Sequence, residues 1–393
     1  MFNNHRMAKY KLIIVVFTLL VIAETATAQS TNRVFEDAEK QLALMYKEAV
    51  ANRNNRQIFP RTLRHDSLHL VASNDWTSGF FPGMLWFMYE YTNKPEWISR
   101  AEEFTALMER EPTNRNSHDV GFKVYNSYGN GYRLTQSEQY KKQVLQGAAT
   151  LVTRFNPTVG CIRSWDFGKW QYPVIIDNMM NLELLFAATK LSGDSTYYKV
   201  AVAHANTTLK NHFRSDYSTF HVVDYDPITG KAIGGSTHQG YADASAWARG
   251  QAWALYGYTM CYRETKNPAY LKQAEQVAAY LMNHTSLPAD KIPVWDFNVP
   301  NLSSEPRDAS AAAIIASALY ELKQYSKNKK QYNAFADKIM KSLTQHYRSP
   351  LGSAKGYILL HSTGHKPVNG EVDTPLIYAD YYYLEALLRK GKK

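Results

Sequence analysis

The sequence predicts an all-α fold, an (α/α)6 toroid in which six helical hairpins close into a ring. Three observations lead to this fold class: a short turn phrase recurs along the chain, the apolar residues around it follow helical spacing, and about twelve helical stretches result. Each helix pair must bury its apolar face against neighbouring pairs. We therefore expect the pairs to pack around one centre.

The recurring phrase is a turn with Asn, Gly or Lys, followed by an aromatic residue and a helix with closely spaced Ala. Its five copies lie at 92–97, 135–140, 192–197, 266–270 and 327–332. Around the third copy, apolar residues recur at intervals of three to four, as at Leu182, Leu185 and Phe186 before the turn and Val200 and Leu209 after it. Each copy therefore predicts a helical hairpin.

The predicted helices lie near 32–53, 79–93, 96–110, 119–133, 137–155, 176–192, 195–212, 244–264, 267–284, 308–326, 330–348 and 375–391. Long connections rich in aromatic residues separate successive pairs, at 56–78, 155–175, 213–243, 285–307 and 349–374. Connections of that length in a compact protein are usually functional. We therefore expect a cleft lined by these connections and by the helix starts beside them.

The first residues have the pattern of a secretory signal. Arg6, Lys9 and Lys11 form a basic start, Leu12–Ala23 is apolar, and residues 26–28 offer a small-X-small cleavage site. An apolar run of this length spans only about 18 Å as a helix, short of the roughly 30 Å hydrocarbon core. The sequence thus predicts a signal peptide over 1–28, one catalytic domain over 29–393, no stable membrane anchor, and a periplasmic or secreted location.

The net charge of +10 falls to +8 once residues 1–28 are removed. A basic balance suits a polyanionic substrate, although charge alone assigns no function. Nucleic acid is a poor candidate partner, because the predicted export signal would remove the chain from it and no Lys/Arg-rich run stands out. Cys161 and Cys261 do not make a disulfide framework, and whether they pair stays open, as does the oligomeric state.

Two acidic residues lie where a sugar-cleaving enzyme would need them. A glycosidase places two carboxyl groups at one bond, one of them protonated at the working pH. Asp119 lies at a predicted helix start, and Asp177 follows three β-branched residues and precedes Met179 and Met180, surroundings that raise a carboxyl pKa by desolvation. The alternative interpretation of both residues is a helix N-cap.

Aromatic residues in or beside the long connections offer flat surfaces on which sugars stack, although most tryptophans simply pack. These residues are Trp76, Trp165, Trp170, Trp247 and Trp253. Arg249 lies between two of them and suits bidentate binding of a carboxylate, with a surface ion pair as the alternative. The chain lacks the common metal-ligand, nucleophile-elbow and phosphate-loop motifs, so we expect no metal and no cofactor.

Taken together, several segments resemble glycoside hydrolase family 88, in that family's order and over almost the whole mature chain. They lie at 75–83, 118–122, 163–166, 176–181, 238–241, 247–253, 307–311 and 380–386. The resemblance implies a six-hairpin α/α toroid with unsaturated glucuronyl hydrolase activity. Such an enzyme removes the 4,5-unsaturated uronic acid from the non-reducing end of lyase-generated oligosaccharides of the glycosaminoglycan type.

The resemblance also implies the chemistry, which is hydration of the vinyl ether double bond. Carried over by motif, Asp177 is the general acid and base, and Asp119 is the second carboxylate that helps to keep it protonated. The substrate-binding positions are Trp76, His118, His221, Gln239, Arg249 and Trp253. The assignment of His221 rests on its spacing to Gln239. The expected partners are unsaturated uronate-containing disaccharides or oligosaccharides.

Three alternatives remain open from the sequence. An unsaturated rhamnogalacturonyl hydrolase has a similar toroid and similar carboxylates. A polysaccharide lyase with an α/α toroid removes a proton with Tyr or His, and it generates the ultraviolet absorbance that a hydratase destroys. A non-catalytic periplasmic glycan-binding protein needs the aromatic residues and Arg249 but tolerates the loss of Asp177.

Overall fold

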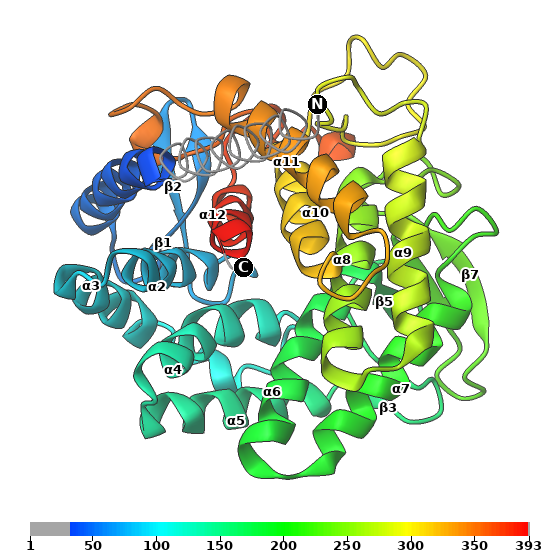
Figure 1. The fold of residues 1–393 in the computed structure, drawn as a ribbon. Coiled ribbons are helices and arrows are strands. Elements are labelled where there is room, and N and C mark those ends of the chain that lie inside the picture. The colour runs from blue at the N-terminus through cyan, green and yellow to red at the C-terminus, as the bar shows by residue number, and fades with distance from the viewer. Residues whose placement is uncertain (1–31, 392–393) are drawn as a thin grey trace, which may run out of the picture.

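The computed structural model describes residues 32–391, so the signal peptide predicted over 1–28 lies outside the described residues. Over this range the chain winds helices in two concentric layers around one centre (Figure 1). No helix in the described range is long and apolar enough to cross a membrane.

The inner layer is a closed ring of helices. Its members are α2 (Phe80–Thr92), a π-helix (Gly121–Gly129) continued by α4 (Asn130–Thr135), α6 (Leu182–Ser192), α8 (Ala248–Thr265), α10 (Ala309–Leu322) and α12 (Ile377–Gly391). Each inner helix packs on the next, and α12 packs on α2, which closes the ring. Every residue of α10 is buried, as expected for a helix enclosed on all sides.

The outer layer covers this ring. It consists of the helix over 32–52, α3 (Pro95–Ala106), α5 (Glu138–Val152), α7 (Ser195–Asn211), α9 (Pro268–Asn283) and α11 (Lys329–His346). Each labelled outer helix packs on an inner helix next to it in the chain. The helix over 32–52 contacts α3 through Tyr46, whose hydroxyl donates to Glu103. Six inner and six outer helices in the described chain confirm the predicted toroid.

The recurring turn phrase has a defined geometry. In four copies the first helix ends on a residue with positive φ, namely Asn93, Gln136, Gly193 or Lys266. The following residue is the N-cap of the next helix; Asp194 and Asn267, for example, accept the backbone N–H groups of Thr196 and Ala269. The fifth copy differs, because α10 ends at Leu322 and α11 begins only at Lys329.

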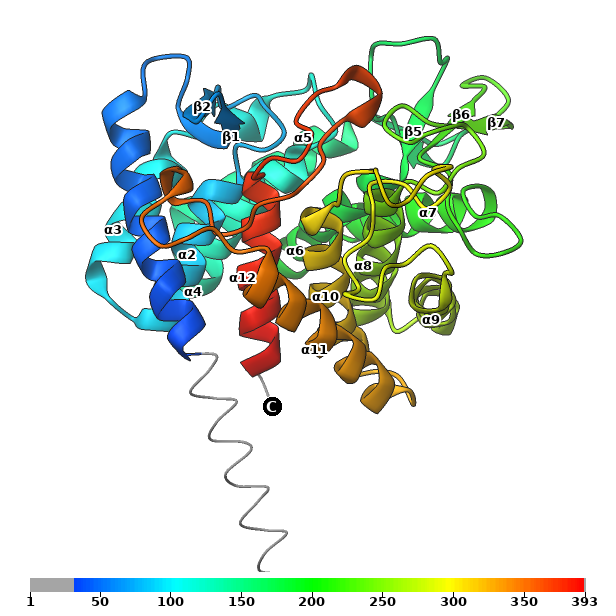
Figure 2. The ribbon, with the colours of Figure 1, turned by 90° about the horizontal axis from the view of Figure 1, so that it is seen from above.

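The connections carry short antiparallel strands that the sequence did not predict. In the described chain these are β1 (Phe59–Arg64), β2 (Ser67–Val71), β3 (Phe155–Asn156), β4 (Cys161–Ile162), β5 (Pro173–Ile175), β6 (Val222–Tyr225) and β7 (Ala232–Ser236). They form the pairs β1-β2 and β3-β4 and the sheet β5-β6-β7. Figure 2 shows β1, β2 and β5–β7 gathered at one face of the toroid. The inner helices begin at this face.

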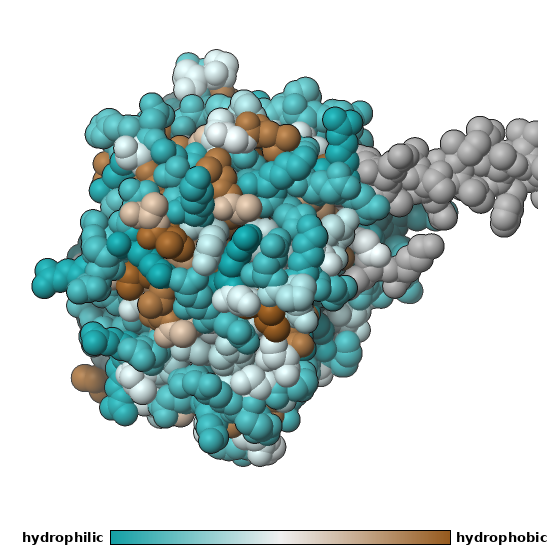
Figure 3. Space-filling view, turned by 90° about the vertical axis from the view of Figure 1, so that its left-hand side faces the viewer, coloured by the Kyte–Doolittle hydropathy of each residue, from teal (hydrophilic) through white to brown (hydrophobic). Residues whose placement is uncertain are grey.

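Cys161 and Cys261 are both buried and both free, which answers the question that the sequence left open. The face shown in Figure 3 is largely hydrophilic, with hydrophobic residues in small groups. The buried apolar side chains instead form one large cluster that runs through both helical layers and a second, small cluster around Tyr172, Val174 and Tyr225.

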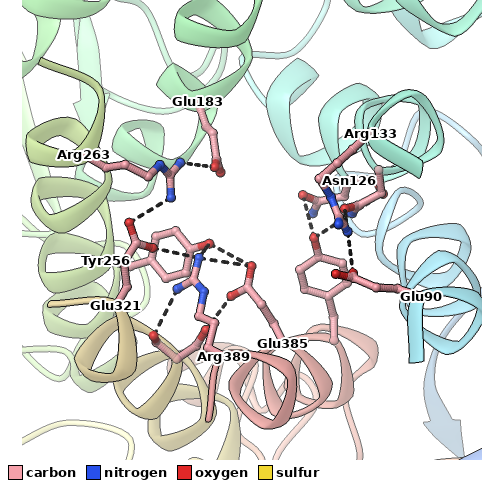
Figure 4. Close-up of polar contacts among 12 residues, drawn as sticks. Glu90, Asn126, Arg133, Glu183, Tyr256, Arg263, Glu321, Glu385 and Arg389 are labelled. Atoms are coloured by element: carbon pink, nitrogen blue, oxygen red, sulfur yellow. Dashed lines mark hydrogen bonds and ion pairs between the residues drawn. The ribbon is translucent and has the colours of Figure 1, made fainter. Parts of the chain in front are cut away.

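An ion-pair network joins four inner helices away from the strands. Arg263 of α8 pairs with Glu183 of α6 and Glu321 of α10, and Arg389 of α12 pairs with Glu321 and Glu385 (Figure 4). These side chains line a cavity of about 350 Å³. Breaking a buried pair by removing one partner leaves an uncompensated charge and is strongly destabilising.

We predict that Arg389→Met lowers the free energy of unfolding by about 3 kcal/mol, because Glu385 and Glu321 lose a buried partner. The matched control is Arg133→Met, which breaks the ion pair between Arg133 and Glu90. The Arg133 side chain is 42 % exposed, so we expect its loss to lower the free energy of unfolding by less than about 1 kcal/mol. Urea unfolding of both variants measures the difference. Equal losses would contradict a special role for the inner network.

Candidate active site

Asp177 and His221 are brought together by strand pairing. Asp177 lies in the 3-10 helix Ile176–Asn181, which directly follows β5. Strand β5 pairs with β6, and the backbone N–H of Ile176 donates to the carbonyl of His221 at 3.0 Å. As a result, Asp177 Oδ2 lies 3.8 Å from His221 Nε2.

The Asp177 carboxyl is buried and is held partly protonated at neutral pH. Its side chain is only 14 % exposed, and Oδ2 has no hydrogen-bond partner in the described chain. Burial raises the pKa of Asp177 to about 7, helped by the charge of Asp119 and opposed by Arg249 and Trp253. A carboxyl in this range can both give and take a proton near pH 7.

Asp119, the other carboxyl group that the sequence singled out, does not cap its helix. The N-cap positions are Val120 for the π-helix and Ile175 for the 3-10 helix that carries Asp177, and neither has a side-chain cap. Asp119 Oδ1 instead lies 3.2 Å from His118 Nε2, and Oδ2 accepts a hydrogen bond from Ser117 Oγ. Neither Asp119 nor Asp177 is therefore explained by the capping alternative.

A glycine lets the segments that carry the two carboxylates approach each other. A Cβ atom on Gly121 would lie 2.5 Å from Asn181 Cα, closer than such atoms come without a shift of the backbone. The same contact gives the π-helix a partner for its first turn, because the backbone N–H of Phe122 donates to Asn181 Oδ1 at 3.0 Å. Gly121 and Asn181 thus fix the position of Asp119 relative to Asp177.

The hydrogen bonds of His221 define its tautomer. Its Nδ1 lies 3.2 Å from the backbone N–H groups of both His238 and Gln239, so Nδ1 must accept. Burial lowers the pKa of His221 well below its ordinary value, so the ring is neutral. The ring proton is therefore on Nε2, the nitrogen that lies beside Asp177.

Several buried polar atoms beside Asp177 and Asp119 have no hydrogen-bond partner in the described chain. They are Asp177 Oδ2, His221 Nε2, Trp253 Nε1 and both ring nitrogens of His118. A buried polar group without a partner costs roughly 1–3 kcal/mol, so such groups call for an explanation. His221 and Trp253 face Asp177, and His118 lies beside Asp119, so the unpartnered atoms gather at the two carboxyl groups and indicate a site built for a polar ligand.

Arg249 is buried and is not the surface ion pair that the sequence allowed. Its side chain is 1 % exposed and pairs with Asp308 at 2.9 Å. Its guanidinium lies 4.5 Å from the ring centre of Trp247 and 5.3 Å from that of Tyr378. Its positive charge acts on Asp177, where it lowers the pKa.

The other predicted site residues join this group. Trp76 packs edge-on against Phe122, which in turn packs against Trp253. Gln239 donates through Nε2 to the carbonyl of Gly364 and through its backbone to His221. The structure thus links all eight predicted residues at the face where the inner helices begin. No group of three or more potential metal ligands occurs among the described residues.

Sequence reasoning gave no role to Asp308 or Tyr378, and it named Trp247 only as one of the aromatic residues on which a sugar could stack; the structure places all three here. Trp247 packs against both His221 and Arg249, Tyr378 flanks Arg249, and Asp308 pairs with it. The sequence signals were the position of Asp308 and Tyr378 at predicted helix starts and that of Trp247 beside Arg249. None of these signals shows which partner the side chain has.

The helical toroid, the two largely buried carboxyl groups and the adjacent arginine fit a carbohydrate-active enzyme of the α/α type. The model of Glycosyl Hydrolase Family 88 matches residues 48–389. The chain belongs to this family.

Comparisons with individual relatives agree with this family membership. The chain is 54 % identical to the unsaturated glucuronyl hydrolase of Formosa agariphila over 84 % of each chain. The crystal structure of an unsaturated glucuronyl hydrolase specific for heparin matches with a TM-score of 0.88 at 47 % identity, covering 91 % of this chain and 97 % of that one. A variant of the Streptococcus agalactiae enzyme complexed with dGlcA-GalNAc6S matches with a TM-score of 0.77 at 29 % identity, covering 92 % and 91 %.

We predict that Gly121→Ala lowers kcat at least tenfold and the free energy of unfolding by about 1–3 kcal/mol, because the added methyl group separates the two carboxylate segments. Gly234→Ala is the matched control, since its Cβ would meet no atom within 4 Å. Steady-state kinetics and urea unfolding of both variants test this. A fully active Gly121→Ala enzyme would show that the close approach is dispensable.

Proposed function

We propose that this unsaturated glucuronyl hydrolase acts through Asp177 as general acid and base. The enzyme removes the 4,5-unsaturated uronic acid from the non-reducing end of glycosaminoglycan-derived oligosaccharides. Its proposed substrates are the unsaturated uronate-containing disaccharides and oligosaccharides that lyases release. Asp119, His118, His221, Gln239, Arg249, Trp76 and Trp253 complete the proposed site.

The proposed reaction is addition of water across the vinyl ether. Asp177 gives its proton to carbon 4 of the uronate, and the resulting carboxylate takes a proton from the water that adds to carbon 5. Carbon 5 then carries both a hydroxyl and the ring oxygen, so it is a hemiketal. The ring opens to a ketone at carbon 5, the hemiacetal at carbon 1 releases the second sugar, and Asp177 ends protonated as it began.

The single observation that carries this proposal is the environment of Asp177. A carboxyl whose pKa lies near 7 is protonated often enough to act as an acid and is a strong enough base once ionised. The unpartnered Nε2–H of His221 lies on the same side as Oδ2 and offers a hydrogen bond to a substrate oxygen. The starts of the inner helices add positive electrostatic potential, which favours an anionic uronate.

Family membership decides between the classes that the sequence left open. The relatives are glucuronyl and chondroitin disaccharide hydrolases, so the lyase and the non-catalytic binding protein are set aside. The rhamnogalacturonyl alternative is less well supported, because the relatives found act on glucuronyl or chondroitin substrates by name.

We propose that the second sugar lies in a neighbouring pocket. This pocket has a volume of about 680 Å³ and is lined by residues 61–65 and 368–374 together with His365. His365 Nε2 lies 2.9 Å from the carbonyl of His238, beside Gln239. The second sugar would thus adjoin the group that binds the uronate.

We further propose that residues 1–28 direct export and that residues 29–393 form the catalytic domain. The basic start, the apolar run and the small-residue cleavage site support export. The enzyme would then work in the periplasm or outside the cell, where lyase products are available.

We predict that Asp177→Asn reduces kcat at least about a thousandfold, because the general acid and base is lost. The assay follows the loss of ultraviolet absorbance with unsaturated disaccharides from chondroitin, hyaluronan and heparin, and the ranking of the three also gives the specificity. Asp226→Asn, in the turn between β6 and β7, is a control with native rates. An active Asp177→Asn enzyme would overturn the mechanism, and silence of the native enzyme on all three would overturn the substrate class.

We predict that kcat/KM of the native enzyme falls as pH rises through about 7, because only protonated Asp177 can start the reaction. Asp119→Asn removes a negative charge that raises the pKa of Asp177, so the remaining activity falls at a pH about half to one unit lower. Complete pH profiles of the two enzymes test the sign. If the fall in activity of Asp119→Asn occurs at the same pH as in the native enzyme, or at a higher pH, the role given to Asp119 is contradicted.

A further inference from the structure

Asp308 is a fully buried carboxylate whose two oxygens do different work. Oδ1 accepts hydrogen bonds from the backbone N–H and the hydroxyl of Ser310, so it caps the start of α10. Oδ2 accepts a hydrogen bond from Arg249 Nη1 at 2.9 Å, on α8. The cap needs only one oxygen, so helix capping does not explain the second bond.

The hydrogen bonds of Arg249 leave one particular edge of its guanidinium unused. Nη1 donates both of its hydrogens, one to Asp308 and one to the carbonyl of Thr363, and Nη2 donates one hydrogen to the carbonyl of Gly364. A guanidinium has five N–H donors. Two donors, one on Nε and one on Nη2, have no partner among the described residues. These two nitrogens share one edge of the guanidinium, and that edge matches the two oxygens of a carboxylate. We call this pair of donors the free edge.

The direction of the free edge depends on the groups that hold the rest of the guanidinium. The rings of Trp247 and Tyr378 flank it, which restricts its tilt, and only the hydrogen bonds fix its rotation in its own plane. Asp308 is the one charged acceptor among these hydrogen-bond partners. It is also anchored itself, because Thr363 Oγ1 donates to the carbonyl of the adjacent Arg307.

We infer that Asp308 is a positioning residue of the reaction, which orients Arg249 so that its free edge binds the carboxylate of the terminal uronate. This inference rests on the proposed function, since it assigns the uronate carboxylate to Arg249. It gives a role to the segment at 307–311, which the family resemblance marked without one. Asp308 contacts no substrate in this account and acts only through Arg249.

Asp308→Ser separates the two tasks of the carboxylate. Serine is also a favourable N-cap, so the variant retains the cap of α10 but loses the partner of Arg249. In a second variant, Asp308→Asn, the amide nitrogen must face either Arg249 or the N–H groups of α10, both of which are donors. The two variants together keep the test independent of a single folding defect.

The assay compares kcat/KM for an unsaturated disaccharide with kcat/KM for its uronate methyl ester, which lacks the negative charge. The native enzyme should prefer the free carboxylate, and we expect Asp308→Ser and Asp308→Asn to reduce that preference about tenfold, mainly through KM. Arg249→Gln should reduce it at least as much. Combining Asp308→Ser with Arg249→Gln should add less than about a twofold further loss, because both changes remove one interaction.

The matched control is Asp380→Asn. Asp380 is also a fully buried aspartate, and its two oxygens accept the backbone N–H groups of Ile358 and Leu359 instead of a bond from Arg249. This variant should lose stability in urea but keep the native preference for the free carboxylate. It therefore measures what the loss of a buried, hydrogen-bonded aspartate does on its own.

Two outcomes in the Asp308 variants overturn the inference by themselves. One is an unchanged preference in the Asp308 variants, and the other is a double variant whose losses multiply. Both leave the proposed function intact, because the native enzyme still consumes the disaccharide. If the native enzyme consumes no unsaturated disaccharide, the proposed function fails, and the inference fails with it. If Arg249→Gln keeps the native preference while the Asp308 variants lose it, the uronate carboxylate is bound elsewhere. That result also overturns the role of Asp308.

Discussion

The rest of the structure depends on one constraint: the proposed reaction needs a carboxyl group that stays protonated near neutral pH at the face where the substrate would bind. Burial achieves this at Asp177, at a cost on the order of 4 kcal/mol for the ionised form. Since the folded protein holds this proton more tightly than the unfolded chain does, the contribution of Asp177 to stability falls as pH rises between about 4 and 7. The unpartnered atoms of His118, His221 and Trp253 add to this cost, so the site is a weak point of the fold that the rest of the molecule must support.

The toroid supplies that support from two directions. At one face, the pairing of β5 with β6, the contact of Gly121 with Asn181 and the ion pair of Asp308 with Arg249 hold the site residues in place. Deeper in the ring, the network around Arg263 and Arg389 holds α6, α8, α10 and α12 together. The six inner helices that begin beside the site are packed on one another in a closed ring. This packing keeps the site residues in position although the site itself lowers the stability of the fold.

The sequence predicted what is local and missed what depends on distant partners. The hairpins were predictable because a residue with positive φ and an N-cap follow each other directly in four of the turns. The strands were not, because β5 and β6 are short and pair across more than forty residues. The sequence also could not decide whether Asp119 caps its helix or contributes to the candidate site instead. The answer depends on a distant residue, because Asn181 Oδ1 accepts the backbone N–H of Phe122 that a capping Asp119 could have bound. Arg249 was recognised by its type, whereas its partner Asp308 emerged only from the packing of α8 against α10.

The measurement that tests the central claim most directly is the titration of the Asp177 carboxyl itself. Carbon-13 NMR of the aspartate carboxyl groups, with Asp177→Asn to assign the resonance, follows the proton without substrate or catalysis. The account predicts a midpoint near pH 7 for Asp177 in the native enzyme. A midpoint near pH 4, the ordinary value for an exposed aspartate, would contradict it, because Asp177 would then be ionised throughout the working range.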